Sequence, residues 1–286
     1  MKMAVIGCGL IGGSMALSWK RAGIVDEVIA FGHNPATLQK ALDKGAAETV
    51  TTSMEEAVKD ADIVVSAVPV EAMESVFTEM APFLKSDAVV TDVGSTRQTV
   101  IAAARKGLGD KFHQYAPAHP IAGGEMPGVD YASADLFDEK VVISTPDEGM
   151  DPKVVTFIEE AWRKAGARVQ AMSPLQHDLT FASVSHLPHV LAYALVDMIA
   201  REENAQEKLK MAGAGFRDFT RIASSSPVMW RDICLSNREA LSHELERYRA
   251  SLDTLQKYID ESDGKALESV FENAVRNRRG LVFPGK

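Results

Sequence analysis

The sequence contains little cysteine, and its two cysteines are poorly placed for a disulfide or a metal. Among 286 residues only Cys8 and Cys234 are cysteines, and they are far apart with no CxxC pair. Disulfide frameworks and cysteine-rich zinc sites require more cysteines at closer spacing. Cys8 also lies inside a glycine-rich turn, where a disulfide would be awkward. We therefore expect reduced thiols and a cytoplasmic protein.

The chain also lacks an excess of basic residues and a long apolar run. Lys and Arg number 31 against 40 Asp and Glu, so the formal charge is −9. Proteins that bind nucleic acids or anionic membranes usually carry an excess of basic residues, so we expect neither as a partner. No charged-then-apolar leader precedes the first strand, which predicts no signal peptide. The longest apolar stretch, 190–200, is interrupted by Asp197 and is too short to span a bilayer.

Short β-branched runs alternate with helical patterns in the first part of the chain. Asn34 before Pro35, and Ser53 three residues before Glu56, are typical helix starts. The predicted strands cover residues 3–6, 28–31, 63–67, 88–91, 141–144 and 167–171. This alternation predicts an α/β fold of the Rossmann type, with a parallel, doubly wound sheet.

The pattern changes after about residue 172. Ser173 and Pro174 mark a helix start, and from there we find helical periodicity without a convincing strand. Apolar residues of the last part fall on one helical face: Leu241, Leu245, Tyr248, Leu252 and Leu255. We therefore predict a nucleotide-binding domain at 1–172 and a helical domain at 173–286. The apolar faces predict a dimer formed through the helical domain.

The segment "AVIGCGLIGGS" contains the glycine pattern of a dinucleotide site. Gly7 permits a tight turn, Gly9 lets the backbone approach a pyrophosphate, and Gly12 lets helix and strand pack closely. The helix that follows offers unpaired N–H groups to the phosphates. The alternative is a turn needed only for packing, but adjacent Gly12 and Gly13 exceed what packing alone would require. The predicted cofactor site also includes Leu10, Ile11, Val68 and Pro69.

The loop after the second strand bears on which cofactor is used. An NAD site usually carries an acid there, but this loop reads Gly32, His33 and Asn34. No carboxylate is present to repel a 2′-phosphate, so we expect NADP to be preferred and NAD to be accepted. The alternative is that this loop does not touch the ribose.

His119, in "YAPAHPIAGGE", is the candidate proton acceptor. A dehydrogenase needs such a group for the carbinol that is oxidised, and neutral imidazole suits this near pH 7. Pro120 favours an extended backbone at His119. Ser95, in "TDVGSTR", ends a strand where open α/β sheets bind ligands, and its hydroxyl can bridge cofactor and substrate. The alternatives are a structural histidine and a helix N-cap.

The helical part contains a histidine pair and an arginine pair. His186 and His189 share one helical face in "SHLPH", and Arg217 and Arg221 share another. Two cations on one face of an acidic protein are a plausible carboxylate site. The alternative is surface pairing with nearby Asp218 and Asp232. Zinc is the other interpretation of the histidines, but no ligand stands at suitable spacing beside them, so we predict no metal.

Taken together, "GCGLIGGS", "DVGS", "HPIAGGE", "SHLPH" and "GFRDFTRIASSSPVMWRDI" resemble the prephenate/arogenate (cyclohexadienyl) dehydrogenases of tyrosine biosynthesis. The resemblance covers nearly the whole chain with its motifs in order. It implies a Rossmann domain, a helical dimerisation domain, and oxidative decarboxylation of a cyclohexadienol with hydride transfer to NAD(P).

The resemblance also implies roles for single residues. His119 would bind the ring 4-hydroxyl and accept its proton, while Ser95 would hydrogen-bond the same hydroxyl near the nicotinamide. Arg221, rather than Arg217, would bind the substrate side-chain carboxylate, and His189 and Trp230 would line that end.

Glu125 would lie at the mouth of the cleft, where it would gate access or sense the substrate side chain. Some relatives carry a regulatory or mutase domain, for which this chain has no room, so we expect any feedback by tyrosine to act at the active site. The competing interpretations are a β-hydroxyacid dehydrogenase, whose lysine motif we do not find near 173–190, and a non-enzymatic dinucleotide sensor.

Overall fold

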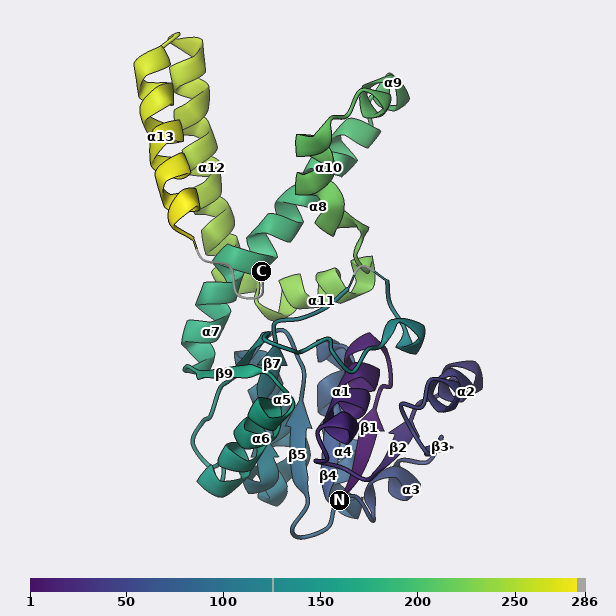
Figure 1. Ribbon diagram of the computed structural model, residues 1–286. Coiled ribbons are helices and arrows are strands. Elements are labelled where there is room, and N and C mark those ends of the chain that lie inside the picture. Colours follow the sequence, from purple (N-terminus) through teal and green to yellow (C-terminus); the bar gives the residue numbers. More distant parts are fainter. Residues whose placement is uncertain (125, 282–286) are drawn as a thin grey trace.

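The computed structural model describes residues 1–124 and 126–281, and its N-terminal half is built on a parallel sheet. The strand order is β3-β2-β1-β4-β5-β6, and every pair is parallel (Figure 1). This order reverses between β1 and β4, which is where open α/β sheets form their ligand crevice. The strands are β1 (Lys2–Ile6), β2 (Glu27–Phe31), β3 (Thr49–Thr51), β4 (Ile63–Ser66), β5 (Val89–Asp92) and β6 (Tyr115–Ala116).

Helices connect these strands, and two of them begin at the predicted caps. Asn34 Oδ1 accepts a hydrogen bond from the Ala36 N–H at 2.9 Å, and Ser53 Oγ accepts one from the Glu56 N–H at 3.3 Å. The Glu56 carboxylate accepts from Thr51 Oγ1 instead of completing a reciprocal capping box. The helices are α1 (Leu10–Arg21), α2 (Pro35–Asp43), α3 (Met54–Val58), α4 (Met73–Met80) and α5 (Gln98–Leu108).

A second, smaller sheet follows the first. It consists of β7 (Ala118–Pro120), β8 (Val141–Ser144) and β9 (Arg168–Ala171), with α6 (Pro152–Lys164) between the last two. β7 is antiparallel to β8, and β8 is parallel to β9. Pro117 separates β6 from β7 and has no N–H to offer a ladder, so the chain leaves the large sheet there. This departure places His119 on a strand of its own.

The described residues from Pro174 onward form helices. Ser173 Oγ accepts a hydrogen bond from the Gln176 N–H at 3.2 Å, which caps the first helix as its sequence predicts. Figure 1 shows α12 and α13 as one projecting hairpin, α8 to α10 as a second arm, and α11 lying across the nucleotide-binding domain. The helices are α7 (Pro174–Phe181), α8 (Leu187–Ala200), α9 (Ala205–Lys210), α10 (Ala214–Thr220), α11 (Pro227–Ser236), α12 (Arg238–Asp260) and α13 (Gly264–Gly280).

The expectation that the longest apolar stretch is too short to span a bilayer is wrong. A π-helical turn at Ala182–His186 joins α7 and α8 into a continuous helix of 27 residues, Pro174–Ala200, which by length and composition is apolar enough to cross a membrane. Its first half buries His177 and Asp178 against the nucleotide-binding domain. Only 22% of its most apolar window is buried. Phe271 and Val275 of α13 are also exposed, so both arms carry apolar surface that an associated chain would cover.

Candidate active site

The glycine turn between β1 and α1 has the shape of a phosphate cradle. Gly7 has a φ of +93°, and a Cβ there would lie 2.7 Å from the Ala67 carbonyl oxygen. A Cβ on Gly12 would lie 2.5 Å from the Gly7 carbonyl oxygen, whereas a Cβ on Gly9 would meet nothing within 4 Å. Gly7 and Gly12 are therefore required by the backbone and its packing, while Gly9 borders open space at the α1 N-terminus. These residues fit a dinucleotide pyrophosphate.

The adjacent Gly13 has a packing role, contrary to our interpretation of the glycine pair. A Cβ at this position would lie 2.9 Å from Val129 Cγ2 and 3.1 Å from Ala132 Cβ. The Ser133 N–H also donates to Ser14 Oγ at 3.0 Å. Gly13 thus lets the segment that follows His119 pack directly on α1.

A cavity of about 440 Å³ lies between the glycine turn, the strand ends and the helical domain. Its lining brings together much of the predicted cofactor and catalytic set with part of the substrate set. The predicted residues among the lining are Gly9, Leu10, Ile11, Gly12, Val68, Pro69, Ser95, His119 and Trp230. Ser95 lies three residues beyond the end of β5 and half-buried, so it is in the loop rather than in the strand.

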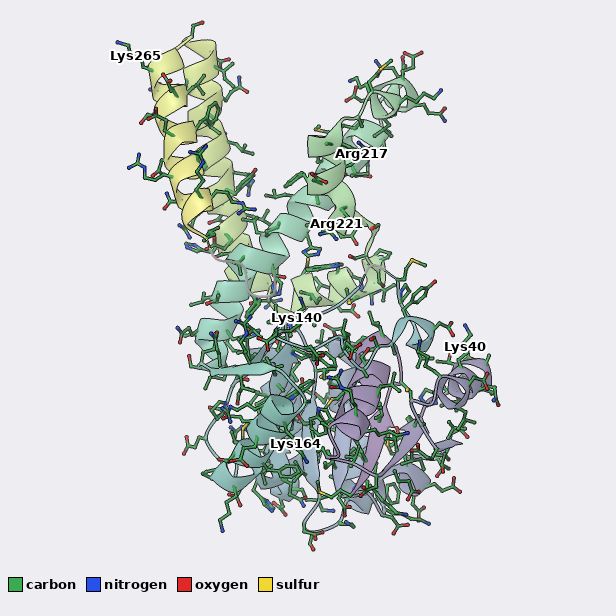
Figure 2. The ribbon with its side chains drawn as sticks, viewed as in Figure 1. Lys40, Lys140, Lys164, Arg217, Arg221 and Lys265 are labelled. Carbon is green, nitrogen blue, oxygen red and sulfur yellow. The ribbon has the colours of Figure 1, made fainter. Side chains whose placement is uncertain are left out.

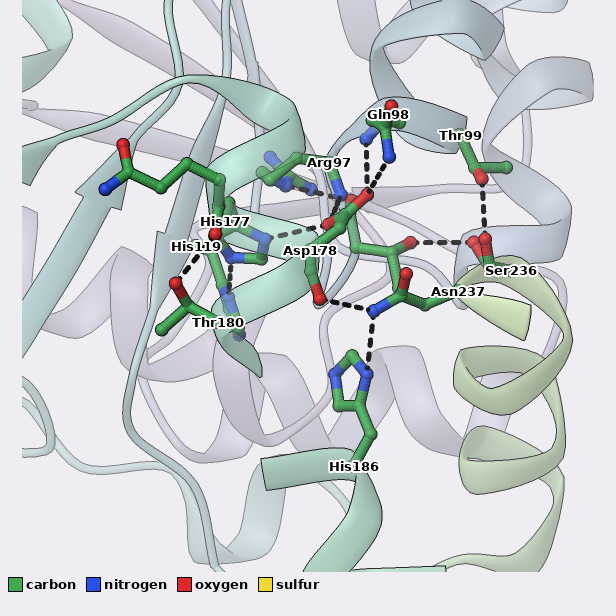
Figure 3. Close-up of polar contacts among 12 residues, drawn as sticks. Arg97, Gln98, Thr99, His119, His177, Asp178, Thr180, His186, Ser236 and Asn237 are labelled. Atoms are coloured by element: carbon green, nitrogen blue, oxygen red, sulfur yellow. Dashed lines mark hydrogen bonds and ion pairs between the residues drawn. The ribbon is translucent and has the colours of Figure 1, made fainter. Parts of the chain in front are cut away.

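His119 is the first member of a hydrogen-bonded chain (Figure 3). Its Nδ1 lies 2.7 Å from Nε2 of His177, and Nδ1 of His177 lies 2.9 Å from Oδ1 of Asp178. A carboxylate accepts, so Nδ1 of a neutral His177 carries the proton and its Nε2 accepts from the Nδ1–H of His119. Nε2 of a neutral His119 is therefore unprotonated. His177 and Asp178 were not predicted as site residues, since neither belongs to a motif with recognisable spacing.

Asp178 also joins the two halves of the chain. Its carboxylate accepts from the Arg97 N–H at 2.7 Å and the Gln98 N–H at 2.9 Å, at the N-terminus of α5. A residue of α7 thus caps a helix of the nucleotide-binding domain, a role for which Ser95 was the alternative candidate. Asn237 Nδ2 donates to the Asp178 carbonyl oxygen at 2.8 Å. These bonds hold α7, and with it His177, at a defined position over α5.

The electrostatics of this hydrogen-bonded chain favour neutral imidazoles. Burial holds the pKa of His119 well below its usual range, and the nearby His177 and Arg97 lower it further. Burial also lowers the pKa of His177, although Asp178 opposes the shift. Arg97 is fully buried and pairs with Asp92 through Nη2 and Oδ1 at 2.7 Å, so its charge is compensated within the core. A neutral His119 is able to accept a proton.

Trp230 and His186 line the other end of the cavity, whereas the predicted His189, Arg217 and Arg221 are not among its lining residues. His189 stacks on Trp230 with ring centroids 3.6 Å apart, and its Nδ1 donates to the Ser185 carbonyl oxygen at 2.8 Å. The buried Nε1 of Trp230 has no acceptor among the described residues. His186 is buried beside them, accepts from Asn237 at 3.2 Å, and has its pKa lowered to about 4 by burial. An orphan indole N–H at a cavity wall suits a ligand oxygen.

The two predicted arginines differ in position. Figure 2 shows Arg221 near the base of the α8–α10 arm and Arg217 farther out along it. Burial lowers the pKa of His189, its bond to Ser185 raises it in part, and the charge of Arg221 lowers it further. Arg221 therefore lies close to the stacked rings. Asp232 forms its ion pair with Arg231, Oδ1 to Nη2 at 2.6 Å, so its proposed pairing with the other two arginines is wrong.

The remaining predicted residues lie outside the cavity lining or outside the described chain. Gly32 and His33 follow β2, and Asn34 caps α2. A Cβ on Gly32 would meet only the Leu38 side chain, at 3.4 Å, so a larger residue fits there. Glu125 is outside the described residues. Within 1–124 and 126–281, no group of three His, Cys, Asp or Glu side chains could hold a metal ion.

Comparison with known families decides between the interpretations. Residues 15–171 match the family described as prephenate dehydrogenase, nucleotide-binding domain, and residues 173–273 match prephenate dehydrogenase, dimerization domain. The chain belongs to the prephenate/arogenate (cyclohexadienyl) dehydrogenase family. It is an oxidoreductase of tyrosine biosynthesis with a NAD-binding domain and a helical dimerisation domain, as the motifs predict.

Relatives of this dehydrogenase match over the whole chain. Cyclohexadienyl dehydrogenase of Zymomonas mobilis is 36% identical over 281 residues, which cover 98% of this chain and 95% of the relative. Prephenate dehydrogenase of Bacillus subtilis is 34% identical and matches 98% of this chain and 76% of its own length. The solved structure of prephenate dehydrogenase from Aquifex aeolicus, in complex with hydroxyphenyl propionate and NAD+, has a TM-score of 0.90 at 34% identity and covers 98% of each chain.

More distant structures share the fold alone. Mycobacterium tuberculosis 3-hydroxyisobutyrate dehydrogenase is 15% identical with a TM-score of 0.51, and it covers 75% of this chain and 71% of its own. The competing β-hydroxyacid interpretation therefore rests on a shared architecture and not on a shared family.

Proposed function

We propose that this protein oxidatively decarboxylates prephenate, arogenate or both. The main support is the arrangement of His119. It hydrogen-bonds to His177, which leaves its Nε2 as a proton acceptor, and it lines the same cavity as Ser95 and the glycine turn. A bound nicotinamide supplies the hydride acceptor. Loss of carbon dioxide makes the ring aromatic and supplies driving force, so the side chains mainly orient and polarise the substrate.

His119 is the general base in this proposal. Nε2 accepts the proton of the ring 4-hydroxyl as hydride leaves the same carbon, and Ser95 hydrogen-bonds that hydroxyl. The Asp178–His177 pair presents an acceptor to His119 Nδ1, which keeps the basic lone pair on Nε2. It also offers a counter-charge to the imidazolium that forms. General-base catalysis of this kind contributes about 10²- to 10⁴-fold.

Arg221, with His189 and Trp230, binds the substrate side chain at the other end. The charge of Arg221 lowers the pKa of His189, so the guanidinium lies near these rings. Trp230 Nε1 has no acceptor in the described chain. A substrate carboxylate would pair with the guanidinium and accept the indole N–H. Arg217 and Glu125 stay proposals as further substrate-binding residues. Prephenate and arogenate both carry this carboxylate, and the keto or amino group beside it separates them.

For the cofactor, we propose a preference for NADP over NAD. Gly32 offers no carboxylate to hold the adenine ribose or to repel a 2′-phosphate, while His33 and the α2 N-terminus at Asn34 offer donors. The chain is similar to a dehydrogenase solved with NAD+, and NAD remains an accepted cofactor in this proposal.

The remaining proposals concern organisation. We place the domain boundary near residue 172, and we propose a cytoplasmic homodimer that uses the exposed apolar faces of the helical domain. Tyrosine, as a product-like ligand, would inhibit by occupying the substrate end of the cavity.

Incubation with prephenate and then arogenate, with each cofactor, tests the proposed function by reduced-cofactor absorbance at 340 nm. We expect turnover with at least one pair. A protein that binds dinucleotide but turns over neither substrate would contradict the proposal and favour a sensor.

A further inference from the structure

Asp232 is a buried carboxylate to which the proposed mechanism gives no role. It lies on α11, is 2% exposed, and lines the cavity between the two halves of the chain. α11 packs against the turn Val70–Ala72, which follows β4 and Pro69. Asp232 thus shares the cavity with Pro69 and Ser95, on the nucleotide-binding side of the substrate pocket.

The ion pair of Asp232 leaves one carboxylate oxygen for the cavity. Arg231 places Nε at 2.7 Å and Nη2 at 2.6 Å from the same oxygen, Oδ1. The Arg231 side chain is 61% exposed, so the pair is solvated on the arginine side and buried on the aspartate side. Oδ2 receives no hydrogen bond from any side chain or N–H group in the described chain. Oδ2 is not among the fully enclosed side-chain atoms that lack a partner, so it keeps accessible surface at the cavity that Asp232 lines. An acceptor in this position is open to a donor that arrives with a ligand.

The proposed substrates are poor candidates for this donor. Their donors already have places in the proposed function. The ring 4-hydroxyl is assigned to His119 and Ser95, and the amino group of arogenate would lie beside the carboxylate that Arg221 binds. A dinucleotide, by contrast, brings ribose hydroxyls and a carboxamide NH2 group, and its oxidised nicotinamide ring is cationic. Pro69 and Ser95 place this half of the cofactor at the wall that Asp232 faces, since the phosphates belong at the glycine turn.

We propose that Asp232 binds the nicotinamide–ribose half of the cofactor from the helical domain. Oδ2 accepts a hydrogen bond from this half, and the carboxylate charge favours the cationic, oxidised form over the reduced form. Asp232 thereby closes the cofactor site from the opposite domain and aids release of the reduced product. This inference rests on the proposed cofactor site.

Calorimetric titration of the intact protein tests the inference with NAD+, NADH and ADP, which ends before the nicotinamide ribose. For Asp232→Asn we expect the Kd of NAD+ to rise about tenfold, that of NADH to rise less, and that of ADP to stay within about twofold. Arg231→Gln removes the partner but keeps the carboxylate, so NAD+ should bind as tightly as in the wild type or more tightly. Asp87→Asn, on an exposed turn of the nucleotide-binding domain, is the matched control.

Several results would overturn the inference. An unchanged Kd for NAD+ in Asp232→Asn would do so, as would equal losses for NAD+ and NADH, or an equal loss for ADP, which would indicate a general disturbance of the fold. If Asp232→Asn does not fold, a tenfold loss of NAD+ affinity in Arg231→Gln would show that the ion pair is only structural. Turnover of the wild type at 340 nm tests the proposed function separately.

Discussion

Replacing His177 by phenylalanine should impair His119 as a general base while leaving the His119 side chain in place. The Phe181 ring stacks on His177 with centroids 4.4 Å apart, and a phenyl ring preserves this contact. What is lost is the Nε2 acceptor, 2.7 Å from His119 Nδ1, and the link to Asp178. The His119 imidazole is then no longer held with its basic lone pair on Nε2.

The magnitude follows from an unsatisfied buried donor. Leaving the Nδ1–H of His119 without an acceptor costs about 1–3 kcal/mol, and the imidazolium formed in the reaction loses its counter-charge. We therefore expect kcat to fall by about 5- to 150-fold, with KM changed much less. His177→Gln can offer an amide oxygen to the same N–H and should recover part of the loss.

The assay is the initial rate of cofactor reduction against substrate concentration and pH. A wild-type kcat in His177→Phe would refute the proposed chain, and so would equal losses in the phenylalanine and glutamine variants. A loss confined to KM would place His177 in substrate binding instead. Unchanged thermal unfolding would establish that the domain contact through Asp178 survives.

Four further outcomes are expected. His119→Asn should keep cofactor affinity by calorimetry and lose about 10²- to 10⁴-fold in kcat, and near-normal turnover would make His119 structural. Burial lowers the pKa of His119, so wild-type kcat/KM should stay constant below pH 6.5 and fall only at more acid pH. A histidine with an ordinary pKa would instead cause kcat/KM to fall near pH 6.5, and that result would contradict this prediction. Arg221→Ala should raise KM about 10- to 150-fold and Arg217→Ala less, and the reverse order would exchange their roles. Gly32→Asp should shift the kcat/KM ratio of the two cofactors toward NAD, and a wild type that strongly prefers NAD would mean other residues hold the ribose.

Two physical properties of the whole protein are also testable. Sedimentation at micromolar concentration should show a dimer, and a stable, active monomer would refute it. His186 has its pKa lowered to about 4, so the folded state binds fewer protons than the unfolded state between pH 6.5 and 4. Stability is therefore fully present above pH 6.5 and is lost as pH falls through that window, which a falling Tm would show and a constant Tm would contradict.

Local signals in the sequence determined the elements and one end of the site. The caps at Asn34, Ser53 and Ser173 bond to N–H groups two or three residues away, so their effect is visible in the sequence. The glycine turn is local in part. Gly7 has a φ of +93°, and a Cβ on Gly12 would lie 2.5 Å from the Gly7 carbonyl oxygen, whereas the atoms nearest a Cβ on Gly7 belong to Ala67 and Val68, about 60 residues away. His119 stood out because the motif around it is short and continuous.

The tertiary structure decided what depends on distant partners. Gly13 is small because Val129 packs on it, and only the fold brings the two together. His177 and Asp178 gain their roles when α7 docks on α5, about 80 residues away in sequence. A histidine next to an aspartate carries no signal of its own, since its chemistry comes from burial and from the imidazole that reaches it across the domain boundary.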